Sequence, residues 1–184
     1  QDIVRLPVTE MGCVAGVSGI IYAKSFLQAN PGKRAAVISV EAPTATFQLE
    51  DFSMSNIVSA AIFGDGAACC LLSSYDSDCG PAILDQEMYH FYDAEDIMGF
   101  KLTNSGMKMI LDVEVPNVIA SHFGAVIHPF LNKNNLEIDA IDYMIFHPGG
   151  KKIVATIEQI FAEFDKDIND TKAILSEYGN MSSA

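Results

Sequence analysis

Three side chains spread along the chain could together carry out covalent chemistry. Cys13 stands between Gly12 and Gly16, directly before a predicted helix over residues 14–29. A helix N-terminus presents unpaired N–H groups and the positive end of the helix dipole, which favour a thiolate. The two glycines permit a sharp turn and the close approach of an acyl chain. The alternative interpretation is a buried structural cysteine, because most cysteines outside disulfides are of that kind.

An imidazole and a carboxamide are the other two candidates. His147 follows the apolar residues 143–146 and precedes two glycines, so its ring is expected to emerge at the end of a strand with open space around it. Asn180 is either a turn residue in a left-handed conformation or a carboxamide that orients a substrate carbonyl. Four histidines without a Cys/His cluster argue against a metal site. We expect no metal and no cofactor.

The elements that must position these side chains alternate between strands and helices, which predicts an α/β fold. Strands are expected at residues 3–9, 35–41, 67–73, 83–92 and 141–147. The run at 35–41 is apolar on both faces, as in a buried parallel sheet. Helices are expected at residues 14–29, 53–63, 116–128, 151–164 and 171–177, with a loop over 93–106. Cys13 and His147 then both lie between a strand end and a helix start, where sites in α/β sheets gather.

Composition excludes several classes of protein. The 184 residues include 11 Lys and Arg against 24 Asp and Glu, a net charge of −13, which argues against nucleic acid or anionic lipid as partners. The charge-free stretch at 12–23 is too short for a membrane span of about 20 apolar residues. The first residue is Gln with no apolar leader, and the four cysteines form no spaced framework. We therefore expect reduced thiols and a cytoplasmic location.

A thiol, an imidazole and an amide indicate covalent catalysis, for which two chemistries fit. Papain-like proteases also carry Cys, His and Asn in this order. Their aromatic signature beside the nucleophile is missing, and the chain has no Trp. The other chemistry is acyl transfer with decarboxylative carbon–carbon bond formation.

Four motifs support the second chemistry. In order, they are Gly-Cys-Val-Ala-Gly at 12–16, Phe-Gly-Asp-Gly-Ala-Ala at 63–68, His-Pro-Gly-Gly at 147–150 and Gly-Asn-Met-Ser-Ser-Ala at 179–184. Together they resemble the motif set of type III polyketide synthases, the chalcone synthase-like branch of the thiolase superfamily. The resemblance implies part of a layered α/β/α/β/α sandwich with mixed sheets and a buried nucleophile helix. Residues 1–80 would be the nucleophile-bearing part of the N-terminal thiolase half, and 81–184 the C-terminal half.

The resemblance also implies roles for the three candidates. Cys13 would accept the starter acyl group from an acyl-CoA, and His147 would keep the thiolate paired. His147 and Asn180 would hydrogen-bond the malonyl-CoA thioester carbonyl and stabilise the enolate formed as CO₂ leaves, an effect of about 3 kcal/mol per donor. The three side chains must then converge around one buried chamber.

Further residues match substrate-binding positions of the family. Phe63 matches the gatekeeping aromatic between the CoA tunnel and the cavity, and Thr46 and Ser182 match cavity-lining positions. Met109 stands where a second gatekeeping aromatic is expected, and Pro43 replaces a threonine of the starter pocket. These two departures favour a long aliphatic starter and an alkylpyrone or alkylresorcinol product.

Lys151 and Lys152 are either a CoA phosphate contact or a solvated pair. The family spans roughly twice this length and its members are homodimers, so we expect an excerpt that lacks an N-terminal portion and the C-terminal end. Two alternatives remain. One is a condensing enzyme of fatty acid synthesis that resembles ketoacyl-ACP synthase III, and the other is a catalytically silent thiolase-fold binding partner.

Overall fold

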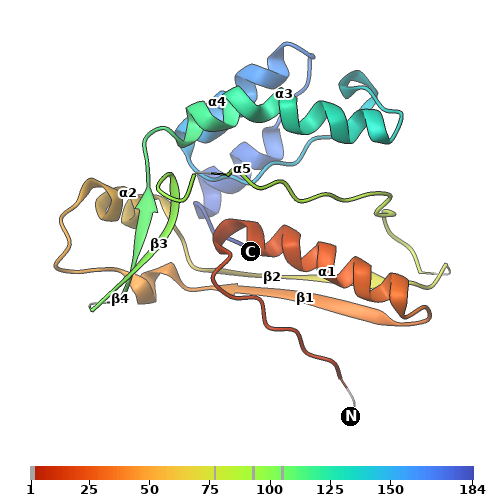
Figure 1. The fold of residues 1–184 in the computed structure, drawn as a ribbon, viewed down its shortest axis with the longest axis horizontal. Coiled ribbons are helices and arrows are strands. Elements are labelled where there is room, and N and C mark those ends of the chain that lie inside the picture. Colours follow the sequence, from red (N-terminus) through yellow and green to blue (C-terminus); the bar gives the residue numbers. More distant parts are fainter. Residues whose placement is uncertain (1–2, 77, 93, 105) are drawn as a thin grey trace. The chain divides into compact units, whose positions relative to one another are not determined.

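The computed structural model describes the chain except at positions 1, 2, 77, 93 and 105. The chain divides into two compact units (Figure 1). The first unit comprises Gln1–Glu41, Gly66–Met88 and Met181–Ala184, and the second comprises Ala42–Asp65 and Tyr89–Asn180. None of the helices in the described residues is both long and apolar enough to cross a membrane.

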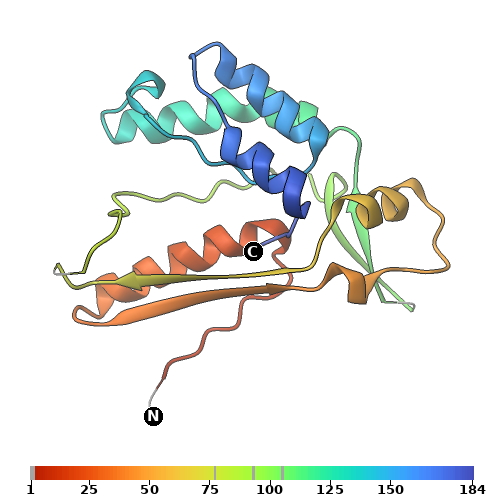
Figure 2. The ribbon, with the colours of Figure 1, turned by 180° about the vertical axis from the view of Figure 1, so that it is seen from behind.

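The first unit is a helix packed on a pair of strands. A short 3₁₀ turn, η1 (Gly12–Val14), leads into α1 (Ala15–Ala29), which ends just before the sequence Asn-Pro-Gly at 30–32. Strand β1 (Arg34–Glu41) pairs with β2 (Gly66–Ser73) along its whole length, and both views show α1 lying along this pair (Figures 1 and 2). The pairing is antiparallel and β1 alternates between exposed and half-buried residues, so the expected parallel strand with two buried faces is wrong.

One face of this strand pair is apolar and exposed. Ile38 and Val40 of β1 are 68% and 73% exposed, and Leu71 of β2 is 69% exposed. Their cross-strand neighbours on the same face include Ala36 and Cys69, which are also exposed. The face opposite α1 is therefore an uncovered hydrophobic surface in the described chain.

The second unit contains the remaining elements. Helix α2 (Met54–Ile62) is capped by Ser53, whose hydroxyl accepts a hydrogen bond from the Asn56 N–H. The helix packs beside a hairpin of β3 (Met98–Thr103) and β4 (Gly106–Leu111). The other elements of this unit are the 3₁₀ turns η2 (Pro43–Thr46) and η3 (Ile138–Ala140) and the helices α3 (Val115–Lys133), α4 (Lys151–Ala162) and α5 (Asn169–Tyr178).

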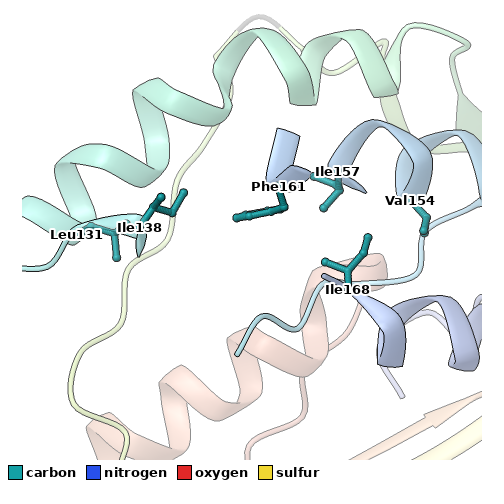
Figure 3. Packing of buried hydrophobic residues seen from close by; sticks show 6 residues of the cluster. All are labelled: Leu131, Ile138, Val154, Ile157, Phe161 and Ile168. Carbon is teal, nitrogen blue, oxygen red and sulfur yellow. The ribbon is translucent and has the colours of Figure 1, made fainter. Parts of the chain in front are cut away.

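The hydrophobic core of the second unit lies among its C-terminal helices (Figure 3). Phe161 of α4 is 1% exposed, and its ring lies edge-on to Phe123 of α3 at 5.3 Å between centroids and tilted against Phe146 at 5.0 Å. The buried members of the cluster are Leu131, Ile138, Val154, Ile157, Phe161 and Ile168. This core holds the segment before His147 against α3 and α4.

Three expected strands are wrong for the described residues. Residues 3–9, 83–92 and 141–147 form no strand, because a strand needs a hydrogen-bonded partner and none of the described strands pairs with them. The expected loop over 93–106 is also wrong in part, since it contains β3; its positions 93 and 105 lie outside the described residues. The expected helices are all present, and α3 continues through Pro129 to Lys133.

The 141–147 segment has a side-chain substitute for a strand partner. The Thr171 hydroxyl, 2% exposed on the first turn of α5, accepts a hydrogen bond from the Phe146 N–H at 3.1 Å and donates to the Phe146 carbonyl at 3.0 Å. One hydroxyl therefore satisfies both backbone groups of the residue before His147.

We predict that Thr171→Val lowers the free energy of unfolding by about 2 kcal/mol, because an isosteric side chain leaves these two backbone groups without partners. Thr171→Ser keeps the hydroxyl and should lose only about 0.8 kcal/mol, for one methyl group. Denaturant unfolding of the three proteins tests this. A valine variant as stable as the serine variant would contradict it.

Candidate active site

The backbone of Asn180 is joined to the end of α2. The Asn180 N–H donates to the Ile62 carbonyl at 2.9 Å, and the Gly64 N–H donates to the Asn180 carbonyl at 2.9 Å. Phe63, between these two residues, forms a parallel bridge with Asn180. The motifs at 63–68 and 179–184 are thus held together by a strand-like backbone contact.

This close approach explains two of the motif glycines. A Cβ on Gly64 would lie 2.5 Å from the Tyr178 carbonyl oxygen, and a Cβ on Gly179 would lie 2.8 Å from the Ile62 carbonyl oxygen. Both distances are shorter than real Cβ contacts allow, and Gly179 also has a φ of 75°. Any side chain at either position would push the Asn180 backbone away from α2.

The Asn180 side chain is tied to the His147 motif. Asn180 is 1% exposed, and its Nδ2 donates to the Gly149 carbonyl oxygen at 3.1 Å. The Gly149 N–H in turn donates to the His147 carbonyl at 2.9 Å, which closes a three-residue turn around Pro148. The structure therefore brings His147, Asn180 and the backbone of Phe63 together within the second unit.

Burial around the imidazole lowers the pKa of His147 below its ordinary value of 6.5, although the residue keeps more than a third of its surface exposed. A lowered pKa keeps the ring neutral at physiological pH within this unit. A neutral imidazole has one N–H donor and one acceptor nitrogen. His147 can therefore donate a hydrogen bond to a carbonyl or accept a proton from a thiol.

Cys13 belongs to the first unit, at the centre of η1 and two residues before α1 begins, near the expected helix start. The space over Gly16 in the first turn of α1 is filled: a Cβ there would collide with the Ser183 carbonyl oxygen. Ser183 is held by Glu41 at the end of β1, whose Oε1 accepts from the Ser183 N–H at 3.3 Å and from its hydroxyl. The expectation that Gly16 leaves room for an acyl chain is therefore wrong.

Thr46 lies at the end of η2, exposed, and its hydroxyl donates to the Pro43 carbonyl at 2.9 Å. Asp65 fixes the same turn, because its carboxylate accepts from the Thr44 N–H at 3.0 Å and from the Thr44 hydroxyl at 2.5 Å. These bonds lower the pKa of Asp65. Asp65 and Glu41 are not among the residues for which the sequence predicts a role. Each is an acidic residue at one end of an apolar strand, and that position is the sequence feature that could have indicated a contact for both.

Met109 lies on β4 opposite Phe100, and its sulfur is 3.2 Å from the Ser59 hydroxyl of α2. The neighbouring Lys108 forms an ion pair with Asp51 at 2.9 Å, and its hydrogen bond lowers the pKa of Asp51 to about 2. The hairpin is thereby fixed to α2 and to the segment before it. The Met109 side chain therefore contacts α2.

The remaining sequence candidates fall in two places. Lys151 and Lys152 are the first two residues of α4, and both are exposed. Ser182 lies in the first unit, 9% exposed, with a φ of 56°. Among the described residues no group of three or more His, Cys, Asp or Glu side chains could hold a metal ion.

Comparison with known proteins decides the family. The profile for "Chalcone and stilbene synthases, C-terminal domain" matches residues 80–184, and the profile for the N-terminal domain of the same enzymes matches residues 1–76. The chain belongs to the chalcone and stilbene synthase family. Its fold is accordingly the thiolase-like α/β fold of type III polyketide synthases.

Individual relatives agree with this placement. The chain is 32% identical to a putative chalcone synthase of Bacillus subtilis, over 98% of this chain and 51% of that protein. It is 33% identical to the 1,3,6,8-tetrahydroxynaphthalene synthase of Streptomyces peucetius, over 100% of this chain and 49% of that protein. The crystal structure of PKS-I from the brown alga Ectocarpus siliculosus superposes with a TM-score of 0.82 and 30% identity, over 94% of this chain and 46% of that one. The chain thus spans about half the length of these relatives.

We predict that Asn180→Asp lowers the free energy of unfolding by about 3 kcal/mol at pH 7, because it places a buried carboxylate against the Gly149 carbonyl oxygen. The loss should shrink at acidic pH, since a protonated carboxyl can donate a hydrogen bond again. Asn117→Asp is a matched control, because the Asn117 Nδ2 also donates to an oxygen, that of Glu114, in an exposed position. Equal losses in the two variants, measured by denaturant unfolding, would refute the role of burial.

Proposed function

We propose that this protein is an acyltransferase of polyketide biosynthesis that condenses an acyl-CoA starter with malonyl-CoA units. The observation that carries the proposal is the hydrogen-bonded link from His147 through Gly149 to the buried Asn180, in a chain of the chalcone and stilbene synthase family. The link joins the His147 backbone to the Asn180 carboxamide, and it supports a site in which the imidazole and the carboxamide both donate to one carbonyl oxygen. Such fixed donors stabilise an enolate as its charge develops.

In the proposed loading step, the Cys13 thiolate attacks the thioester carbonyl of the starter. A new sulfur–carbon bond forms, the bond to the CoA sulfur breaks, and CoA leaves as a thiolate that takes up a proton. Placement at a helix start supports Cys13 as the nucleophile, because the N–H groups there stabilise the thiolate. The proposal requires Cys13 to meet His147 and Asn180 around one chamber.

In the proposed extension step, His147 and Asn180 hold the malonyl thioester carbonyl. The bond between the malonyl carbon and its carboxylate breaks, CO₂ leaves, and the electron pair remains as the enolate. The enolate carbon then attacks the acyl-Cys13 carbonyl, and the bond to sulfur breaks to restore the thiolate. The neutral imidazole favoured by the lowered pKa of His147 supports the donor role in this step.

The substrate-binding residues are part of the same proposal. Phe63, Thr46, Ser182 and Met109 would line the route of the acyl chain, as the family resemblance implies. The adaptable thioether of Met109 supports a long aliphatic starter and an alkylpyrone or alkylresorcinol product. Residues 1–80 and 81–184 would contribute to the two thiolase halves, in a cytoplasmic homodimer that needs no cofactor beyond its CoA substrates.

We predict that lauroyl-CoA adds one acyl group to the purified protein, seen as a mass shift on the peptide containing Cys13. Cys13→Ala should abolish the shift, while Cys79→Ala, at an exposed cysteine, should keep it. With malonyl-CoA, hexanoyl- and lauroyl-CoA should yield products faster than coumaroyl-CoA. Turnover of coumaroyl-CoA alone would refute the aliphatic starter, and activity only with carrier-protein substrates would favour the fatty acid alternative.

We predict that reversing both charges with Lys151→Glu and Lys152→Glu raises the KM for CoA substrates about tenfold at low salt, because the pair faces solvent at a helix start, where anions bind. Lys33→Glu with Lys101→Glu changes the net charge equally at two other exposed positions and serves as the control. Steady-state kinetics at two ionic strengths measures both pairs. The same KM in the 151–152 variant and the wild type would identify a solvated pair.

A further inference from the structure

Gly149 lies between the proposed catalytic residues His147 and Asn180. Its backbone N–H and its carbonyl each form a hydrogen bond with one of these two residues. Its N–H donates to the His147 carbonyl at 2.9 Å, and its carbonyl accepts from the Asn180 Nδ2 at 3.1 Å. The turn that results suits Pro148 at its centre, because proline holds φ near the value such a turn requires. The orientation of the Asn180 carboxamide relative to His147 therefore depends on the position of this one peptide.

The missing side chain of Gly149 has a separate effect on the imidazole. A Cβ built on Gly149 would lie 3.4 Å from Cδ2 and 3.6 Å from Nε2 of His147. These are ordinary van der Waals contacts, so a methyl group would cover that edge of the ring without a collision. The nearest atom would be Cδ1 of Ile153 at 3.1 Å, at the far end of a flexible side chain.

Backbone conformation does not explain this glycine. Gly149 is absent from the glycines with positive φ, whereas its neighbour Gly150 has a φ of 156°. An alanine at 149 therefore has no positive-φ strain, and its methyl group would occupy the space beside the imidazole and the end of the Ile153 side chain.

We infer that Gly149 is a positioning residue, which fixes Asn180 relative to His147 and keeps the Nε2 edge of the imidazole open to a thioester carbonyl. The inference rests on the proposed function, because it names the group that enters the space. It extends that function by assigning the approach direction of the malonyl thioester to the side of the ring that faces Gly149.

The test is Gly149→Ala, which adds one methyl group to that edge. Decarboxylation of malonyl-CoA should fall about 100-fold, the loss associated with displacing a reacting group by about 1 Å. The pKa of His147, followed by NMR titration of its ring protons, should fall further, because the methyl group removes water from the imidazole. A pKa equal to that of the wild type would overturn the inference, with or without activity.

Gly124→Ala is a closely matched control. A Cβ on Gly124 would lie 3.4 Å from Cδ2 and 3.7 Å from Nε2 of His128, nearly the same contact with a histidine outside the proposed site. Gly124 lies inside α3, where alanine is the better helix former. This variant should decarboxylate malonyl-CoA at the wild-type rate. Equal rates in the two alanine variants would refute the role of Gly149.

A double variant separates access from packing. Gly149→Ala with Ile153→Val removes the Cδ1 atom nearest the new methyl group while leaving the methyl group beside His147. The double variant should remain as impaired as Gly149→Ala, and recovery of the rate would refute the inference. A wild-type protein that neither acylates Cys13 nor decarboxylates malonyl-CoA would refute the proposed function instead, while the His147 titration would still test the geometry.

Discussion

The hydrogen bond from the Asn180 carboxamide to the Gly149 carbonyl is the contact on which the proposed site depends. It is made by a side chain that is 1% exposed, so water does not compete with it. It joins the end of α5 to the turn before α4, while the backbone of Asn180 joins the same point to the end of α2. Three helices are thereby held at a single residue. In the proposed function, this junction would supply the fixed geometry that enolate stabilisation requires.

A second buried polar contact supports the same region from the other side of His147. The Thr171 hydroxyl bonds both backbone groups of Phe146, whose ring packs against Phe161 in the core. The residues before His147 are thus held by Thr171 of α5 and by hydrophobic packing, and Gly149 after it is held by Asn180, just beyond the end of α5. His147 as a residue keeps more than a third of its surface exposed, so a hydrogen-bonded backbone is combined with access for a ligand.

Local sequence signals predicted the helices well and the strands poorly. The Asn-Pro-Gly stop after α1 and the Ser53 cap of α2 act between neighbouring residues, so the sequence carries them directly. Residues 141–147 have the composition of a strand, yet their partner is a threonine hydroxyl distant in sequence. The antiparallel register of β1 and β2 also depends on a distant partner. Residue types made His147 and Asn180 candidates, whereas the carbonyl that links their motifs belongs to a glycine, which has no side chain to suggest a role.

The bare face of the β1–β2 pair has a consequence for handling this chain in solution. Ile38, Val40 and Leu71 form a hydrophobic surface next to strand edges whose backbone groups have no strand partner in the described chain. Such edges template intermolecular β pairing, and an apolar surface adds a driving force that grows on warming. A polypeptide limited to these residues will therefore self-associate, and the associated fraction will rise with its concentration. Expression at low temperature and dilute purification will yield more monomer than concentrated, warm preparations.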